Sequence, residues 1–229
     1  PKRPCALERA HRKFIRDSRG MNKLPLLFTG ILIAFGASWL GLVAYPVSNL
    51  GHLQPLDDED TAGYFPPSVS GLAVAGQKVY ASAGCVYCHS QQVRLDPTST
   101  DIAKKLGVRQ TVPRDYIREK TAFLGKRRIG QDLSNVGARI SDANALHQYL
   151  YEPATVTPWG KMPSYRYLYK TTKVVSQPSA DAIQGLKGPH APPAGYEVIP
   201  TEDAKALVAY LLSLTKNYPL PESPEPTAK

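Results

Sequence analysis

The chain has 229 residues, 42% of them hydrophobic and 21% charged, which allows one domain of ordinary size and some additional segments. Its three cysteines do not make a disulfide framework, because two of them belong to one motif and Cys5 is left over. The formal net charge of +9 is mostly local: residues 1–23 hold eight Lys or Arg and two acidic residues, so +6 lies there and +3 in the rest. This distribution argues against nucleic-acid binding, which needs a basic face on the folded domain.

Residues 24–45 contain no charged side chain and follow the basic tail directly. A helix that crosses a bilayer needs about 20 apolar residues, so we expect a transmembrane helix here. Pro25 falls in its first turn, where a missing N–H costs little, and Trp39 and Tyr45 suit the far membrane interface. The Lys and Arg of residues 1–23 then place the N-terminus in the cytoplasm and the rest of the chain outside.

A cleaved signal peptide is the alternative for this segment. Its apolar core would be about 7–15 residues long and would end at a small-x-small site. The run here is longer, and Tyr45-Pro46-Val47 after it do not offer such a site. We therefore expect a retained anchor, while the use of residues 1–20 stays open because Met21 would itself be a natural start.

Two proline-rich segments flank the remainder of the chain. Residues 46–69 include the acidic run Asp57-Asp58-Glu59-Asp60, and we interpret them as a solvated linker. Binding of a partner or a metal ion by the acidic run is the alternative. Residues 219–229 have four prolines in eleven positions and are expected to be an extended tail, mobile or lying over a neighbouring subunit.

Residues 84–94 read Gly-Cys-Val-Tyr-Cys-His-Ser-Gln-Gln-Val-Arg, and Cys85-x-x-Cys88-His89 within them is the attachment motif of a c-type haem. Two thiols at this spacing add to the two porphyrin vinyl groups, and His89 supplies the proximal iron ligand. A thioredoxin-like redox pair would need a strand pattern before Cys85, which is missing. A zinc site would need further ligands, and no other Cys lies in this region.

Two helices are predicted at the two ends of the domain. Ser70 is the expected N-cap of a helix over residues 71–83, and Thr201 that of a helix over residues 202–216. The second helix has an apolar face at helical spacing, formed by Ala204, Leu207, Val208, Leu211 and Leu212.

The spacing Gly76-x-x-x-Tyr80-x-x-x-Gly-Cys-x-x-Cys-His resembles the N-terminal helix of class I cytochromes c. This resemblance implies an all-α, class I cytochrome c-like domain over residues 70–218. In that fold, the glycine and the aromatic residue contact the C-terminal helix where the two helices cross closely. Tyr210 is the expected partner of Gly76 and Tyr80.

The sixth iron ligand is predicted to be Met162. A lone Met is more often a core residue, but Pro163 follows it as in the ligand loop of class I cytochromes, and the other Met borders the membrane segment. A Met–His pair raises the potential and suits electron transfer. His147, in an apparent helix over residues 143–151, is the competitor, and His52 and His190 are weaker candidates.

Residues 126–139 resemble the Arg-x-Gly-Pro-Asp-Leu-x-x-Val-Gly stretch of membrane-bound mono-haem cytochromes. In that stretch, the proline carbonyl accepts a hydrogen bond from the proximal His; Gln131 replaces the proline here but keeps a carbonyl. The resemblance also implies that Leu133 packs on the haem. Arg128 and Arg139 are candidates to neutralise the haem propionates, and a solvated basic turn is the alternative for the run that ends at Arg128.

Several segments together resemble the mono-haem, membrane-anchored subunit (subunit II) of cbb₃-type, C-family haem–copper oxidases. These are residues 84–94, 130–139, 141–142, His147 and 159–165. The pair Ser90-Gln91 after the haem histidine is the most specific piece. The resemblance covers residues 24–45 and about 70–170, and it implies one covalent haem c with Trp159 among its neighbours. Residues 95–125 and 170–200 depart from the family and are interpreted as insertions.

The resemblance implies an electron-transfer subunit of the respiratory chain in a bacterial inner membrane. Its partners would be a cytochrome c donor, soluble or a neighbouring subunit, and a membrane-embedded catalytic subunit that holds the oxygen-reducing centre. No catalytic residues are expected in this chain. The alternatives are the corresponding subunit of a nitric oxide reductase or a quinol-oxidising complex, a stand-alone tethered cytochrome, and a haem sensor without a strong sixth ligand.

Overall fold

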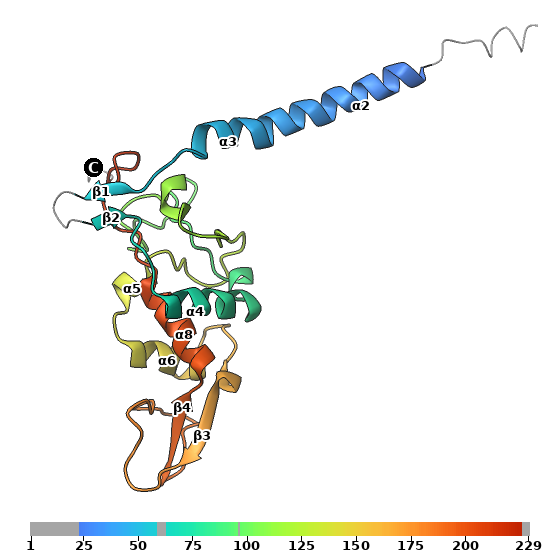
Figure 1. Ribbon diagram of the computed structural model, residues 1–229. Helices are drawn as coiled ribbons and strands as arrows, with labels where there is room; N and C mark the ends of the chain where they lie inside the picture. Colours follow the sequence, from blue (N-terminus) through green and yellow to red (C-terminus); the bar gives the residue numbers. More distant parts are fainter. Residues whose placement is uncertain (1–22, 59–62, 96, 226–229) are drawn as a thin grey trace, which may run out of the picture. The chain divides into compact units, whose positions relative to one another are not determined.

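In the computed structural model, residues 23–58, 63–95 and 97–225 are described (Figure 1). The chain divides between residues 53 and 54 into a helical N-terminal unit and a larger domain. The predicted basic tail, with Cys5 and Met21, lies outside the described residues.

The described part of the N-terminal unit contains one continuous helix made of three consecutive segments, α2 (Leu24–Trp39), η1 (Leu40–Ala44) and α3 (Tyr45–Leu50). It is long and apolar enough to cross a membrane by length and composition, spanning about 40 Å at 1.5 Å per residue. It ends five residues later than predicted. The segment η1 is a wider π turn in which the Tyr45 N–H bonds to the Leu40 carbonyl. Such a turn lets the helix continue past Pro46, whose ring and missing N–H disturb ordinary helical bonding.

The prediction of an all-α fold is confirmed only in part, because two small antiparallel sheets accompany the helices. Strands β1 (Leu56–Asp58) and β2 (Gly63–Phe65) form a hairpin within the predicted linker. Strands β3 (Tyr169–Lys173) and β4 (Tyr196–Pro200) pair within the second predicted insertion, with Tyr169 opposite Pro200. Both sheets have only two strands, too small for a hydrophobic face of their own, so the helices still form the core.

The core is built around the crossing of α4 (Gly71–Ser82) and α8 (Glu202–Ser213) (Figure 1). Their N-caps are the predicted ones: Ser70 Oγ accepts from Ala73 N at 3.2 Å, and Thr201 Oγ1 accepts from Ala204 N at 3.3 Å. A Cβ atom at Gly76 would lie 1.8 Å from the Ala206 carbonyl oxygen of α8, so only glycine permits this approach.

Tyr80, one turn after Gly76, is fully buried in the same crossing. Its ring packs edge-on against Tyr210, with 5.4 Å between the centroids. The predicted contact of Gly76 and Tyr80 with Tyr210 is therefore confirmed.

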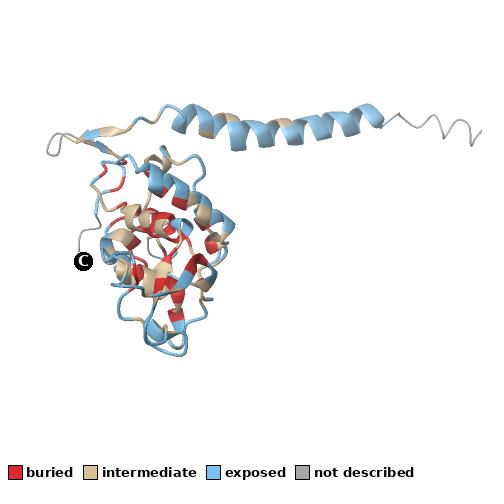
Figure 2. Ribbon diagram, turned by 60° about the horizontal axis from the view of Figure 1, so that its bottom comes forward, coloured by how far each residue is buried: buried red, intermediate tan, exposed pale blue. Residues whose placement is uncertain are grey.

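The remaining elements are short and wrap the helix pair: η2 (Cys85–Tyr87), η3 (Pro113–Tyr116), α5 (Val136–Arg139), α6 (Ala143–Tyr151), α7 (Pro153–Val156) and η4 (Arg166–Leu168). The helix α6 has its predicted bounds and is capped by Asp142, which accepts from Asn144 N at 2.9 Å. The buried residues gather along α4, α6 and α8 (Figure 2). One apolar cluster includes Cys85, so the haem motif borders the core.

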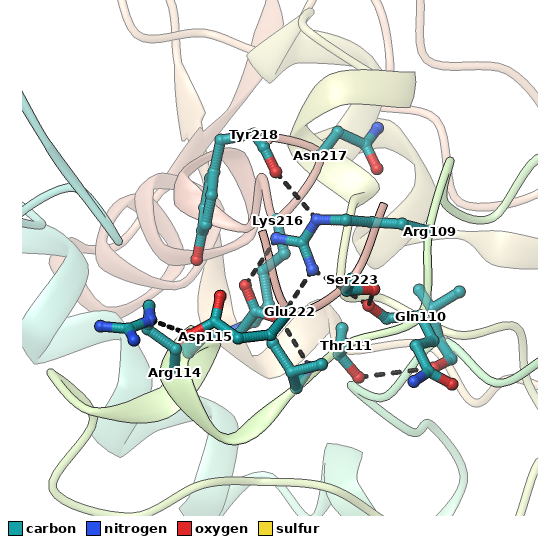
Figure 3. A network of polar contacts seen from close by, with 12 residues as sticks. Arg109, Gln110, Thr111, Arg114, Asp115, Lys216, Asn217, Tyr218, Glu222 and Ser223 are labelled. Carbon is teal, nitrogen blue, oxygen red and sulfur yellow. Dashed lines mark hydrogen bonds and ion pairs between the residues drawn. The ribbon is translucent and has the colours of Figure 1, made fainter. Parts of the chain in front are cut away.

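The predicted insertion over residues 95–125 packs against the C-terminal segment through buried charges (Figure 3). Arg109 pairs with Asp115 and also donates from Nε to the Tyr218 carbonyl at 2.8 Å. Leu220 and Ser223, in the predicted extended tail, are each 3% exposed. The described part of this tail is therefore packed on its own domain.

Candidate haem-binding site

Cys85, Cys88 and His89 lie in a tight turn that directly follows α4. The N–H groups of Cys88 and His89 both bond to the Cys85 carbonyl, at 3.2 and 3.0 Å. This winding brings the three side chains onto one short turn at the end of a helix that is anchored in the core. Cys85 is buried, Cys88 is half-buried, and both thiols are free, as a covalent bond to a porphyrin requires.

The ring of His89 is oriented by a carbonyl from a distant loop. Its Nδ1 lies 2.8 Å from the Gln131 carbonyl oxygen, the contact that the resemblance assigns to a proline at this position. Burial lowers the pKa of His89, and the opposing effects of the Gln131 carbonyl and the Asp132 carboxylate do not overcome it. A neutral ring that donates from Nδ1 keeps its Nε2 lone pair, which is the form that binds a metal.

Gly130 lets the loop backbone lie against this ring. A Cβ atom here would stand 2.2 Å from His89 Cε1 and 2.6 Å from Nδ1, far inside van der Waals contact. The Gly130 N–H also donates to the Cys88 carbonyl at 2.9 Å. The sequence motif contained this glycine, but its role depends on a contact 41 positions away that only the fold reveals.

A buried carboxylate that sequence reasoning did not single out joins the two loops. Asp132 is 1% exposed and accepts from Ser90 Oγ at 2.6 Å and Gln92 N at 2.7 Å. Its other oxygen accepts from Ser134 N at 2.9 Å. The segment that follows His89 is thereby tied to the segment that orients its ring.

Gln91 connects the haem motif to the helix crossing. Its side chain is fully buried, and its Oε1 accepts from the Tyr210 hydroxyl at 3.1 Å. Its backbone carbonyl accepts from the Tyr116 hydroxyl at 2.6 Å. The pair Ser90-Gln91 therefore has a physical reason: Ser90 binds the Asp132 loop, and Gln91 binds α8.

Met162 and Leu133 are partly buried and pack against the apolar cluster that contains Cys85. The loop that carries Met162 is held where the Tyr165 N–H donates to the Leu150 carbonyl at 2.8 Å. Trp159 in the same loop is 81% exposed. Coordination by Met162 and contact of a haem with Leu133 or Trp159 stay predictions.

The competing histidines have other surroundings. His147 Nδ1 lies 3.1 Å from the Tyr169 hydroxyl, and the two rings pack edge to face. His190 Nε2 lies 3.7 Å from Glu152 Oε2, and His52 is exposed and belongs to the N-terminal unit.

The two candidate arginines both bind the loops around His89. Arg139 donates from Nη1 to Gln131 Oε1 at 2.9 Å and from Nη2 to the Asp132 carbonyl at 2.6 Å. Arg128 Nη1 lies 2.5 Å from Asp101 Oδ1, within the first predicted insertion. The Nε atom of each arginine is buried without a hydrogen-bond partner among the described residues. Each guanidinium thus retains a donor for a further anionic group.

The donor set suits a covalently attached c-type haem. It comprises two free thiols at the required spacing, an imidazole with its Nδ1 engaged, and two arginines with unused donors. Gly130 has no Cβ atom and so leaves room for the imidazole ring of His89.

A family model described as cytochrome c oxidase, mono-heme subunit/FixO matches residues 62–189, more than half of the chain. The matched range contains the Cys85–His89 turn, the loop around Gln131 and the Met162 loop. No curated protein matches the chain.

Proposed function

We propose that this chain, which belongs to the mono-haem subunit (FixO) family of cytochrome c oxidase, is the membrane-anchored electron-transfer subunit of a cbb₃-type oxidase. One haem c would be attached through Cys85 and Cys88. The observation that carries the proposal is the Cys85-x-x-Cys88-His89 turn with its imidazole bonded to the Gln131 carbonyl at 2.8 Å. When bound, the haem supplies a one-electron couple.

We assign His89 and Met162 as the two axial ligands. The Gln131 carbonyl holds the His89 ring, so the ring needs no rearrangement when the iron changes oxidation state. Leu133 and Trp159 would shield the haem faces and edge. The unused Nε donors of Arg128 and Arg139 support their role as partners of the propionates, because a buried carboxylate is stable only when paired.

The helix of residues 24–50 would anchor the domain in the bacterial inner membrane, with the cytochrome domain on the extracytoplasmic side. This arrangement rests on the apolar length of the helix and on the basic residues that precede it. In the proposed route, a cytochrome c donor delivers electrons to this domain. The domain relays them to the membrane-embedded subunit, where oxygen is reduced.

The test is to purify the native complex in mild detergent, record haem spectra and identify the subunits by mass spectrometry. We expect haem c bound covalently to this chain, together with haem b, a large polytopic subunit and oxygen consumption. Isolation of the chain alone, or with quinol-oxidising or nitric-oxide-reducing subunits, would contradict the oxidase assignment. Absence of covalent haem would contradict the role of the cysteines, and so would retention of normal haem in a Cys85→Ser/Cys88→Ser variant.

A further inference from the structure

We infer that Asp132 is a positioning residue whose buried carboxylate lowers the redox potential of the haem couple. It would act through its charge and by holding the loop at Gln131, which orients the His89 ring. This inference rests on the proposed function, because it concerns the haem that His89 would ligate. Asp132 is not proposed to contact the porphyrin or to ligate the iron.

Asp132 is held as a carboxylate by the groups around it. It is 1% exposed, and it accepts three hydrogen bonds, from the Ser90 hydroxyl and from the N–H groups of Gln92 and Ser134, at 2.6 to 2.9 Å. A buried carboxylate that accepts two backbone N–H bonds and a hydroxyl bond is stabilised in its charged form. The three donors around Asp132 therefore suit its carboxylate form, which places a negative charge inside the domain.

Two short links connect Asp132 to His89, the proposed iron ligand. Asp132 directly follows Gln131, whose carbonyl bonds to His89 Nδ1 at 2.8 Å. It also binds Ser90, which directly follows His89, at 2.6 Å. Loss of Asp132 would remove the charge and also release the segment after His89 from the loop that orients its ring.

Arg128 compensates this charge only in part. Its guanidinium lies 2.5 Å from Asp101 Oδ1 but 3.6 Å from Asp132 Oδ2, so two carboxylates share one cation and Asp101 is the closer partner. Arg139 is the other cation in contact, and it binds the backbone carbonyl of Asp132 at 2.6 Å. Among the described residues, no cation therefore donates a hydrogen bond to the Asp132 carboxylate itself.

A nearby negative charge favours ferric over ferrous haem, because the ferric form carries one more positive charge. Removal of the Asp132 charge should therefore raise the midpoint potential. Removal of the Arg128 charge should lower it. A substitution that merely loosens the haem site has a different effect. Water that enters the site favours the more highly charged ferric form, so loosening by itself lowers the midpoint potential whether Asp132 or Arg128 is replaced.

The experiment is a redox titration of haem c in the purified oxidase that contains the full chain, with Asp132→Asn and Arg128→Gln compared with the parent. We expect the ferrous-to-ferric ratio at a fixed applied potential to rise by up to about tenfold in Asp132→Asn, equivalent to about 59 mV for one electron. We expect it to fall in Arg128→Gln. A potential that is unchanged or lowered in Asp132→Asn overturns the inference.

Two further variants separate charge from shape. Asp132→Glu keeps the charge with a longer side chain and should stay closer to the parent potential than Asp132→Asn. Asp101→Asn removes the same charge on the far side of Arg128 and should raise the potential by less than Asp132→Asn. If Asp132→Asn does not assemble, an Asp101→Asn variant with a lowered potential would overturn the inference instead.

A separate measurement shows whether the proposed function, rather than the role of Asp132, is wrong. The pyridine haemochrome spectrum of the parent chain reports covalent haem c without any titration. Absence of that spectrum rejects the haem assignment. Its presence, with no upward shift in Asp132→Asn, rejects only the role of Asp132.

Discussion

Arg109 and Asp115 form a bidentate ion pair within the domain, with guanidinium-to-carboxylate distances of 2.8 and 3.0 Å (Figure 3). Their side chains are 1% and 0% exposed. The pair also binds backbone: Arg109 donates to the Tyr218 carbonyl, and Asp115 accepts from the Val112 N–H at 2.8 Å. It therefore joins the segment before η3 to the backbone at Tyr218, after α8.

Asp115→Asn should destabilise the domain by about 3–5 kcal/mol, because it leaves a buried guanidinium without its charge partner. The measurement is urea unfolding of the full chain in detergent, followed by circular dichroism. Glu222→Gln is the matched control, since it breaks the pair with Arg114 at the surface and should cost about 1 kcal/mol or less. Equal losses in the two variants would contradict a structural role for the buried pair.

Gly76→Ala should separate α4 from α8. The added Cβ atom would stand 1.8 Å from the Ala206 carbonyl oxygen, which is backbone and cannot rotate away. We expect a loss of about 3 kcal/mol or more, at the upper end for overpacked cores. Gly71→Ala is the control on the same helix, because a Cβ atom there meets nothing within 4 Å. Equal unfolding midpoints for both variants would show that α4 and α8 do not approach this closely at Gly76.

The parts of the fold that local rules govern could be predicted from the sequence. Ser70 and Thr201 cap their helices through bonds to the third residue on, a distance over which sequence patterns are informative. The β3–β4 hairpin could not be predicted in this way. Its strands are separated by 22 residues of irregular chain, and its pairing depends on how the insertion folds back.

The candidate haem site also contains residues that the sequence identifies and residues whose role depends on long-range contacts. Cys85, Cys88 and His89 are recognisable because covalent chemistry requires their spacing, and the role of the Gln131 carbonyl followed from a resemblance. Asp132 could not be singled out, because its partner Ser90 lies 42 positions away. Asp132 lies within the stretch of residues 126–139 that resembles a known motif, but the sequence does not show that its side chain is buried or what it binds.

Stability should fall in acid partly because of Asp101. Burial by itself raises the pKa of this carboxyl, but bonds from Arg128, Ser99 and the Arg94 N–H outweigh it, and the pKa lies below its usual value. The folded protein thus binds this proton less tightly than the unfolded chain does. The stabilisation is complete above the unfolded-state pKa of about 4 and is lost as pH falls through the lower folded-state pKa.

Asp101→Asn should remove this contribution, so the stability difference between parent and variant should be largest near neutral pH and shrink below about pH 4. Unfolding in urea at a series of pH values measures this difference. Ser99→Ala keeps the carboxylate but loses the bond that Ser99 Oγ donates to Asp101 and the bond that it accepts from Arg128. It should show a smaller change of the same sign. A constant difference between parent and Asp101→Asn at all pH values would exclude the proposed linkage.

Gly130→Ala should disturb the iron ligand while Gln131→Ala should not, because the loop orients His89 through its backbone. A methyl group at position 130 would occupy the space of the imidazole, 2.2 Å from Cε1, so the ring must leave the Gln131 carbonyl. Removal of the Gln131 side chain keeps that carbonyl and loses only the 2.9 Å bond from Arg139.

The absorption spectrum of the assembled oxidase should therefore show weakened low-spin haem c bands in Gly130→Ala, with partial high-spin character or lost haem. Gln131→Ala should retain the parent spectrum, and a loss of low-spin haem in Gln131→Ala alone would mean that the side chain, rather than the carbonyl, holds the ring.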